Sequence, residues 1–309
     1  MAELTLSLAC PACYAPLETR RQNCLVCPTD GREYLSQDGI WRCLLPERIR
    51  FYNRFLDEYE TVRTAERRGS QNPAYYHHLP FAPSSDLYHA DWQLRARSFI
   101  ALLGHVIGPM EKQITMPLNI LDLGAGNGWL SHRLAERGHR LAAIDLRCST
   151  LDGLGAIRYY PLPVTAVQAE FDHLPFLSGD INLAIFNASL HYSTDYSTTL
   201  REVLRVITRE GCLAIVDTPV YRQAESGQAM VAERQERFLS LYGFRSDAIP
   251  CQNFLTPAQL SQLAVELNLE WRFFQPNSGV RWMLHRWKAH LRLKREPANF
   301  PIIVGKRIL

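Results

Sequence analysis

Strand-like and helix-like hydrophobic patterns alternate through the middle of this 309-residue chain. From Asn119 the run NILDLGAGNGWLSHRLAERGHRLAAIDL predicts a buried strand, a glycine turn and an amphipathic helix that ends at Gly138. A second buried strand follows and ends in Asp145. This order of elements is half of a nucleotide-binding βαβ unit. The pattern therefore predicts an α/β fold with a cofactor bound near the turn.

Two further helices are predicted before this unit. Residues 48–68 carry aromatic and aliphatic side chains at helical spacing among charged ones, and a second helix is expected from about Tyr88 to Ile107. The stretch between them, GSQNPAYYHHLPFAPSSD at residues 69–86, is irregular. It is either a lid that contacts substrate through Tyr75 and Tyr76 or an ordinary packed connector. The sequence leaves both interpretations open.

Composition and charge narrow the class of protein. A hydrophobic content of 47% is ample for a buried core, and a net charge of only +3 does not by itself indicate a polyanionic partner. No apolar run reaches the roughly eighteen residues that cross a bilayer, and the start MAELTLSLACPACY lacks the features of a secretory signal. We therefore expect a cytoplasmic protein without integral membrane association.

Four of the eight cysteines cluster near the N-terminus. They form two C-x-x-C pairs separated by ten residues: Cys10, Cys13, Cys24 and Cys27. This spacing can present four thiolates to one zinc ion, and four thiolates leave no open position for catalysis. Buried free thiols or a redox dithiol are the alternatives, but no strand leads into a helix at either pair, as a redox motif requires. We predict a structural zinc ribbon over residues 1–46, with short strands at 32–35 and 40–45.

The residues of the glycine turn indicate which of two kinds of cofactor the chain binds. Glycines at 124, 126 and 128 allow a sharp turn and a close approach to a ligand, and Asp145 can accept hydrogen bonds from both hydroxyls of a ribose. A dinucleotide fingerprint would need glycine at position 129, where this chain has Trp129. The carboxylate of Asp122, just before the turn, suits an ammonium and a sulfonium better than a pyrophosphate.

At this point the chain resembles the class I S-adenosylmethionine (SAM)-dependent methyltransferases, in the UbiE-like, type 11 branch. Their first motif, D-x-G-x-G-x-G after a strand, is matched by Asp122, Gly124, Gly126 and Gly128. Three later motifs follow in the family's order: AEFDHLPF (169–176), INLAIFNASLHY (181–192) and LREVLRVITREGCLAIVDTP (200–219). Near the C-terminus, WRFF from Trp271 and FPIIVGKRI resemble the closing antiparallel pair of this fold.

The resemblance implies an architecture and a set of cofactor contacts. The expected fold is a Rossmann-like sheet of seven strands, mostly parallel with an antiparallel last strand, with helices on both faces. The methyltransferase domain would span residues 47–309, with a helical extension to 110, a core at 111–220, an insertion at 221–268 and closing strands at 269–309. SAM would be held by residues that match the family's motifs: Asp122 at the methionine amino end, the three glycines, Asp145 at the ribose, Glu170 at the adenine and Asn187 near the methyl group.

The residues that would bind the methyl acceptor are less well defined by the sequence. The chain has Asn187-Ala188-Ser189-Leu190 where adenine and glutamine N-methyltransferases usually have Asn-Pro-Pro-Tyr, which disfavours an exocyclic amine target. Tyr192 stands where the type 11 pattern has a second histidine. His191 is either a base with a near-neutral pKa or a structural histidine. The insertion is expected to contribute Tyr221 and Arg222 to the acceptor pocket.

Three functions remain open from the sequence. The leading hypothesis is methyl transfer to a small-molecule O, N or C nucleophile, braced by the zinc ribbon. The second is an RNA nucleobase methyltransferase, since some ribosomal RNA guanine methyltransferases carry such a ribbon and residues 281–295 are basic and aromatic. A solvated helix is the alternative interpretation of residues 281–295. The third is a catalytically silent protein of the same fold that binds a partner. The oligomeric state is not predicted.

Overall fold

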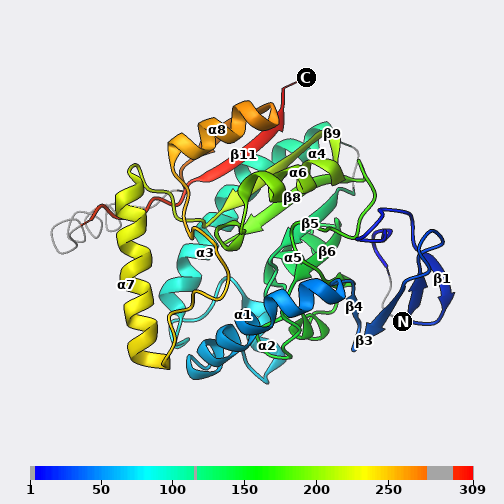
Figure 1. Ribbon diagram of the computed structural model, residues 1–309, viewed down its shortest axis with the longest axis horizontal. Coiled ribbons are helices and arrows are strands. Elements are labelled where there is room, and N and C mark those ends of the chain that lie inside the picture. The colour runs from blue at the N-terminus through cyan, green and yellow to red at the C-terminus, as the bar shows by residue number, and fades with distance from the viewer. Residues whose placement is uncertain (1–3, 115–116, 277–294, 309) are drawn as a thin grey trace.

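A single mixed sheet forms the centre of the protein in the computed structural model, which describes residues 4–114, 117–276 and 295–308 (Figure 1). Its eleven strands lie in the order β1-β2-β3-β4-β7-β6-β5-β8-β9-β11-β10. The seven strands from β7 onwards are β7 (Thr165–Gln168), β6 (Arg140–Asp145), β5 (Asn119–Leu123), β8 (Ile181–Asn187), β9 (Ile207–Val216), β11 (Ile302–Arg307) and β10 (Leu269–Phe274).

Strand direction follows the predicted α/β pattern. Strands β5 to β9 pair in parallel, while β11 pairs antiparallel with both β9 and β10. The chain builds outwards from β5 to β7, then crosses back to place β8 on the other side of β5. Ligands of open α/β sheets bind at such a reversal, beyond the carboxyl ends of the strands. The topology thus places a site after β5 and β8.

Helices cover both faces of the sheet, as predicted. Successive residues of β5 show this, because Ile120 packs in one hydrophobic cluster and Leu121 in another, as alternating side chains of a buried strand must. One face carries α3 (His89–Leu102), α4 (Gly108–Gln113) and α5 (Trp129–Ala135), and the other carries α6 (Tyr196–Val206) and α8 (Pro257–Leu267). A π-helical turn at Leu103–Ile107 joins α3 to α4.

The N-terminal strands alter the expected strand count. They are β1 (Glu18–Arg21), β2 (Cys24–Val26), β3 (Glu33–Gln37) and β4 (Ile40–Arg42). We predicted a separate ribbon beside a seven-stranded sheet, but β4 pairs in parallel with β7, with Ile40 opposite Ala166. The free edge of β7 is therefore occupied, and the sheet continues from the core into the ribbon.

The predicted helix at residues 48–68 is α1 (Pro46–Ala65), which begins earlier because Pro46 favours the first turn of a helix. The irregular stretch contains the short helix α2 (Pro73–His78), and Tyr76 there is fully buried. Its hydroxyl lies within hydrogen-bond distance of the carbonyl oxygens of Ser70 and Leu151, at 2.7 and 2.6 Å, and donates its one proton between them. These contacts are those of a packed connector and favour that interpretation over a lid.

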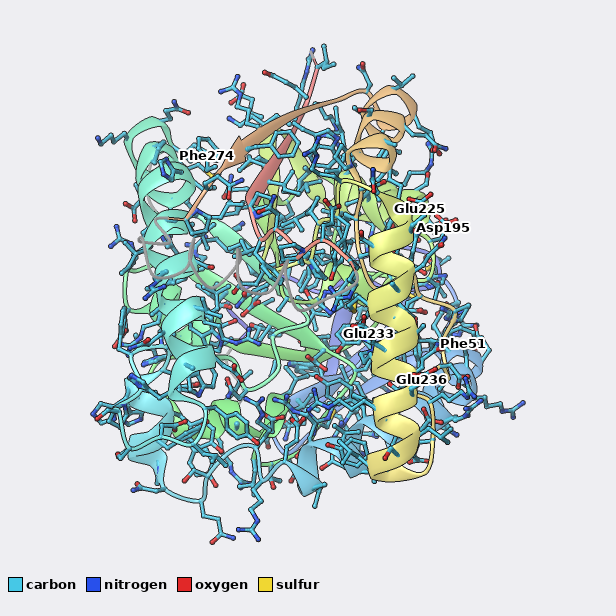
Figure 2. All side chains as sticks on the ribbon, turned by 90° about the vertical axis from the view of Figure 1, so that its left-hand side faces the viewer. Phe51, Asp195, Glu225, Glu233, Glu236 and Phe274 are labelled. Carbon is cyan, nitrogen blue, oxygen red and sulfur yellow. The ribbon has the colours of Figure 1, made fainter. Side chains whose placement is uncertain are left out.

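The insertion forms α7 (Ala224–Tyr242), which lies on the same side of the molecule as α3 (Figures 1 and 2). The basic segment at 281–295 falls outside the described residues except for Arg295. Within the described ranges, no helix combines the length and the apolar character that crossing a bilayer requires.

Candidate functional site

The loop between β5 and α5 has a backbone that only glycine adopts easily. Gly124, Gly126 and Gly128 have φ angles of +75°, +56° and +76°, in the left-handed region. The amide N–H groups of Gly124 and Ala125 donate to the carbonyl of Ile144, at 2.8 and 2.9 Å, which fixes the loop against β6. A Cβ at Gly124 would lie 2.4 Å from the Cβ of Ser189, whereas one at Gly126 would meet nothing within 4 Å. Gly126 therefore presents open backbone to a ligand.

Two alanine substitutions should separate these roles. We expect Gly124→Ala to lower the free energy of unfolding by about 3 kcal/mol, since it adds overpacking to the left-handed strain. Gly126→Ala should cost only the strain, about 1 kcal/mol. Urea denaturation of both variants measures the difference. Equal losses would contradict the close approach of Gly124 to Ser189.

A cleft opens beside this loop and has a volume of about 1190 Å³, counting the part that is open to solvent. Four segments of the parallel core line it, all at the carboxyl edge of the sheet: residues 124–127, 145–147, 170–172 and 187–189. The remaining lining residues are Tyr52, Phe55, Tyr59, Arg63, Arg68, Trp92, Arg95, Trp129, Asp152, Tyr192, Ser193, Thr194 and Ile249.

Asp145 and Asn187, both predicted to contact the cofactor, line this cleft. The two carboxylate oxygens of Asp145 each accept a backbone N–H, from Arg147 and from Gly126, at 2.8 Å. These bonds fix the orientation of the carboxylate and leave further acceptor positions on each oxygen. Asn187 is the last residue of β8, and its side-chain amide makes no hydrogen bond to the described residues. Both groups are therefore placed to meet a ligand.

Glu170 also lines the cleft, but its carboxylate already has protein partners. Arg48 of α1 donates to both of its oxygens, at 2.6 to 2.8 Å, Tyr52 donates at 3.0 Å, and His173 lies 2.8 Å away. Only 2% of the Glu170 side chain is exposed. An adenine amino group would have to share this carboxylate with Arg48. The bonds from Arg48 and Tyr52 also tie α1 to the sheet.

Asp122 does not line the cleft. It is buried beneath the loop, where one oxygen accepts from the N–H and the hydroxyl of Ser131, at 3.2 and 2.8 Å. Its other oxygen has no hydrogen-bond partner among the described residues. Burial raises the pKa of this carboxyl to about 7. In this structure Asp122 holds the first turn of α5 through Ser131, and its contact with the methionine amino end of a cofactor stays a prediction.

Helix α1 supplies a wall that sequence reasoning missed. Tyr52, Phe55 and Tyr59 stand at helical spacing and line the cleft, and the rings of Phe55 and Tyr59 lie 5.8 and 6.0 Å from the ring of Tyr192. The aromatic periodicity of this helix was visible in the sequence. It predicted a buried face but could not show that the face covers a cleft.

The residues predicted for catalysis and acceptor binding lie outside the cleft lining. His191 is buried next to Tyr192, and burial, together with Arg234 and Arg95, lowers its pKa to about 3, which makes it a poor proton acceptor near pH 7. Tyr75 and Tyr76 pack in a hydrophobic cluster. Tyr221 is buried with Arg295 at 3.2 Å from its hydroxyl, and Arg222 is exposed.

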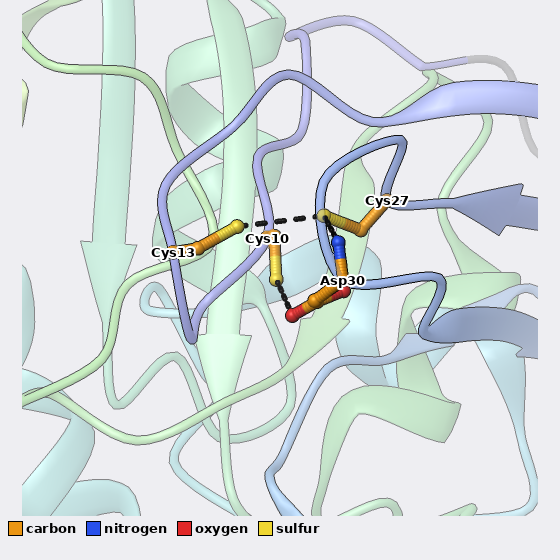
Figure 3. Close-up of side chains that lie close together, drawn as sticks. All are labelled: Cys10, Cys13, Cys27 and Asp30. Atoms are coloured by element: carbon orange, nitrogen blue, oxygen red, sulfur yellow. Dashed lines mark hydrogen bonds between the residues drawn. The ribbon is translucent and has the colours of Figure 1, made fainter.

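A separate group of possible metal ligands lies in the N-terminal ribbon (Figure 3). The thiols of Cys10, Cys13 and Cys27 and a carboxylate oxygen of Asp30 all lie within 4.8 Å of one another. The sulfurs of Cys13 and Cys27 are 3.4 Å apart, near the ~3.8 Å edge of a tetrahedron built on Zn–S bonds. The thiol of Cys24 instead lies 3.4 Å from Glu33. The structure thus groups Asp30, and not Cys24, with the other three cysteines.

The similarity to known proteins lies in the central part of the chain. A family model described as a methyltransferase domain matches residues 121–215, from β5 to the end of β9. That segment holds the glycine loop, Asp145 and Asn187. It is less than a third of the chain, so it supports a class I SAM-dependent methyltransferase domain here without describing the ribbon, α1 or the insertion.

Two curated relatives match over a similar length. The malonyl-[acyl-carrier protein] O-methyltransferase of Legionella pneumophila is 33% identical over 103 residues, which is 31% of this chain and 35% of that protein. An uncharacterized methyltransferase of Mycobacterium tuberculosis is 29% identical over 97 residues, 31% of this chain and 49% of that one. The chain thus spans between a third and a half of the length of these relatives.

Among solved structures, an S-adenosylmethionine-dependent methyltransferase from Mesorhizobium loti is 17% identical, with a TM-score of 0.47. The match covers 65% of this chain and 96% of that one. The sequence matches therefore support a methyltransferase domain at residues 121–215.

Proposed function

We propose that the chain is a SAM-dependent methyltransferase that acts on a small-molecule nucleophile. The observation that carries this proposal is the cleft at the carboxyl edge of β5, β6 and β8, where an open glycine backbone faces buried carboxylates. Four acids line it: Asp145, Asp152, Glu170 and Asp172. Asp152 and Glu170 pair with arginines, whereas Asp145 and Asp172 form no ion pair with a described residue. A ligand with a sulfonium and an ammonium carries a charge that suits these two carboxylates.

The donor set fits this cofactor. Gly126 would allow close approach, Asp145 would accept from the ribose hydroxyls, and the amide of Asn187 would stand near the transferred group. SAM supplies an activated methyl group, so the protein has mainly to align the acceptor and exclude water. No described side chain needs to act as a strong base, which agrees with the low pKa of His191.

The other two hypotheses have less support from the described residues. The RNA alternative relied on the ribbon and on the basic segment at 281–295. Only Arg295 of that segment is described, and its side chain pairs with Glu233 at 2.9 Å. A catalytically silent protein would not need the cleft. The binding experiment that tests the main proposal also tests this alternative.

Calorimetric titration with S-adenosylhomocysteine tests the proposal. We expect binding to the wild-type protein and an affinity about 100-fold lower for Asp145→Asn, because hydrogen bonds to a charged acceptor contribute ~1.5–3 kcal/mol each. Asp57→Asn is the matched control, since Asp57 is an exposed acid on α1. Thermal unfolding of each variant checks that the fold is retained. A wild-type protein that binds neither this ligand nor SAM would refute the proposal.

We also propose that the N-terminal ribbon holds a structural zinc ion through Cys10, Cys13, Cys27 and Asp30. The group lies in the ribbon, in elements other than those that line the cleft. Three thiolates and a carboxylate are a donor set that zinc accepts. The role we assign to the metal is to hold β1 to β3, which have little apolar surface of their own, against β4.

A further inference from the structure

One cationic side chain in the cleft forms no ion pair with any of the described residues. Four arginines line the cleft, and three of them pair with carboxylates. The pairs are Arg63 with Asp152, Arg68 with Asp91 and Arg147 with Glu60. Arg95 makes no hydrogen bond and no ion pair with any described residue. As far as the described residues go, its guanidinium therefore keeps all of its donors free for a ligand.

Helix α3 holds Arg95 in a fixed place. Its neighbour one turn earlier, Trp92, also lines the cleft, with the guanidinium 5.6 Å from the indole ring. One turn later, the hydroxyl of Ser98 donates to Asp217 at the end of β9, at 2.6 Å. Residues three apart share one face of a helix. The contact between Ser98 and Asp217 therefore sets the rotation of α3 that turns Arg95 towards the cleft.

Asp217 is close enough to interact electrostatically with Arg95, but the two do not form an ion pair. No nitrogen of Arg95 lies within 4.0 Å of its carboxylate, although Arg95 lowers the pKa of Asp217 against the larger, opposite effect of burial. On the other side, Arg95 and Arg234 of α7 both lower the pKa of His191.

The lining of the cleft carries charges of both signs. Carboxylates line the cleft around β6, while Arg95 lies on α3 beside Trp92, whose ring meets that of Trp129 edge to face at 6.3 Å. Flat apolar walls next to an unpaired guanidinium fit a planar molecule that carries an oxyanion.

We propose that Arg95 anchors the methyl acceptor, and that the acceptor is a small planar molecule with a carboxylate or phosphate group. This inference rests on the proposed methyltransferase function, because it assigns the acceptor half of the same cleft. Guanidinium binds either group through paired hydrogen bonds. The anchor is independent of which atom of the acceptor receives the methyl group.

The test compares charged and neutral ligands of the same shape. Benzoate, phenyl phosphate and neutral benzamide are titrated into the full-length protein saturated with S-adenosylhomocysteine, and affinity is measured by calorimetry. We expect at least one of the two anions to bind about 10-fold or more tightly than benzamide. Benzoate and phenyl phosphate distinguish a carboxylate site from a phosphate site.

Two variants assign the preference to Arg95. Arg95→Gln should remove it and leave the affinity for S-adenosylhomocysteine unchanged, while Arg97→Gln should retain it, since Arg97 is exposed on the same helix and does not line the cleft. If neither anion binds more tightly than benzamide, or if Arg95→Gln keeps the preference, the inference is wrong. Loss of S-adenosylhomocysteine binding by the wild-type protein would instead refute the proposed function.

Discussion

Replacing Cys10 with serine is expected to remove a bound zinc ion from the ribbon, whereas Cys24→Ser is expected to leave it in place. The thiol of Cys10 lies 3.4 Å from Asp30 within the ligand group, while that of Cys24 lies against Glu33. Structural zinc sites contribute ~10–16 kcal/mol of binding free energy, so loss of one thiolate should release the metal to a mild chelator. Zinc content per chain after dialysis measures the outcome.

The variant Asp30→Asn distinguishes between the two possible sets of zinc ligands. If the four cysteines alone bind the metal, as the spacing of the C-x-x-C pairs suggested, Asp30→Asn keeps the zinc and Cys24→Ser loses it. That pattern would contradict the ligand set proposed from the structure. A wild-type protein that takes up no zinc from zinc-containing medium would contradict both ligand sets.

Asp122 should make the protein less stable as the pH rises. Its pKa is raised from 3.8 to about 7 in the folded chain by burial. A carboxyl with a raised folded pKa stabilises the fold fully below pH 3.8, and this contribution is lost as the pH rises through 7. At about 1.4 kcal/mol per pKa unit, the loss by pH 8 is about 4 kcal/mol.

Comparison with Asp122→Asn isolates this effect from other titrating groups. We expect the free energy of unfolding of the wild type to fall relative to that of the variant between pH 4 and pH 8, in urea titrations. The difference in free energy of unfolding between the wild type and Asp57→Asn, a change at an exposed position, should not vary with pH. Parallel pH profiles for wild type and Asp122→Asn would mean that Asp122 is ionised at little cost in the folded chain.

The cofactor loop was the most predictable part of the site because its signals are local. Gly124 and Gly126 adopt the left-handed backbone that glycine permits, and Asp145 follows at the end of the next strand, as its place in the pattern implied. Each of these positions is fixed by near neighbours in the chain. The order of the parallel strands followed in the same way from the motifs.

The acceptor side was less predictable because it is assembled from distant segments. Tyr59, Arg95 and Tyr192 meet at one cleft, yet no spacing along the chain links them. An amphipathic pattern shows that a helix buries one face, but not what that face covers. Tyr221 and Tyr76 looked like contact residues for the converse reason, since an aromatic residue in a loop is equally suited to fill a core.

The pairing of β4 with β7 has a consequence for the order in which the chain can fold. Arg42 and its hydrogen-bonded neighbour Gln168 are 126 residues apart, so β4 leaves the ribosome long before its partner strand exists. Contacts of such separation form late, since they close a long loop. Until the first strands of the core are complete, the newly made ribbon can therefore rely only on contacts within itself, such as the pairing of β2 with β1 and β3.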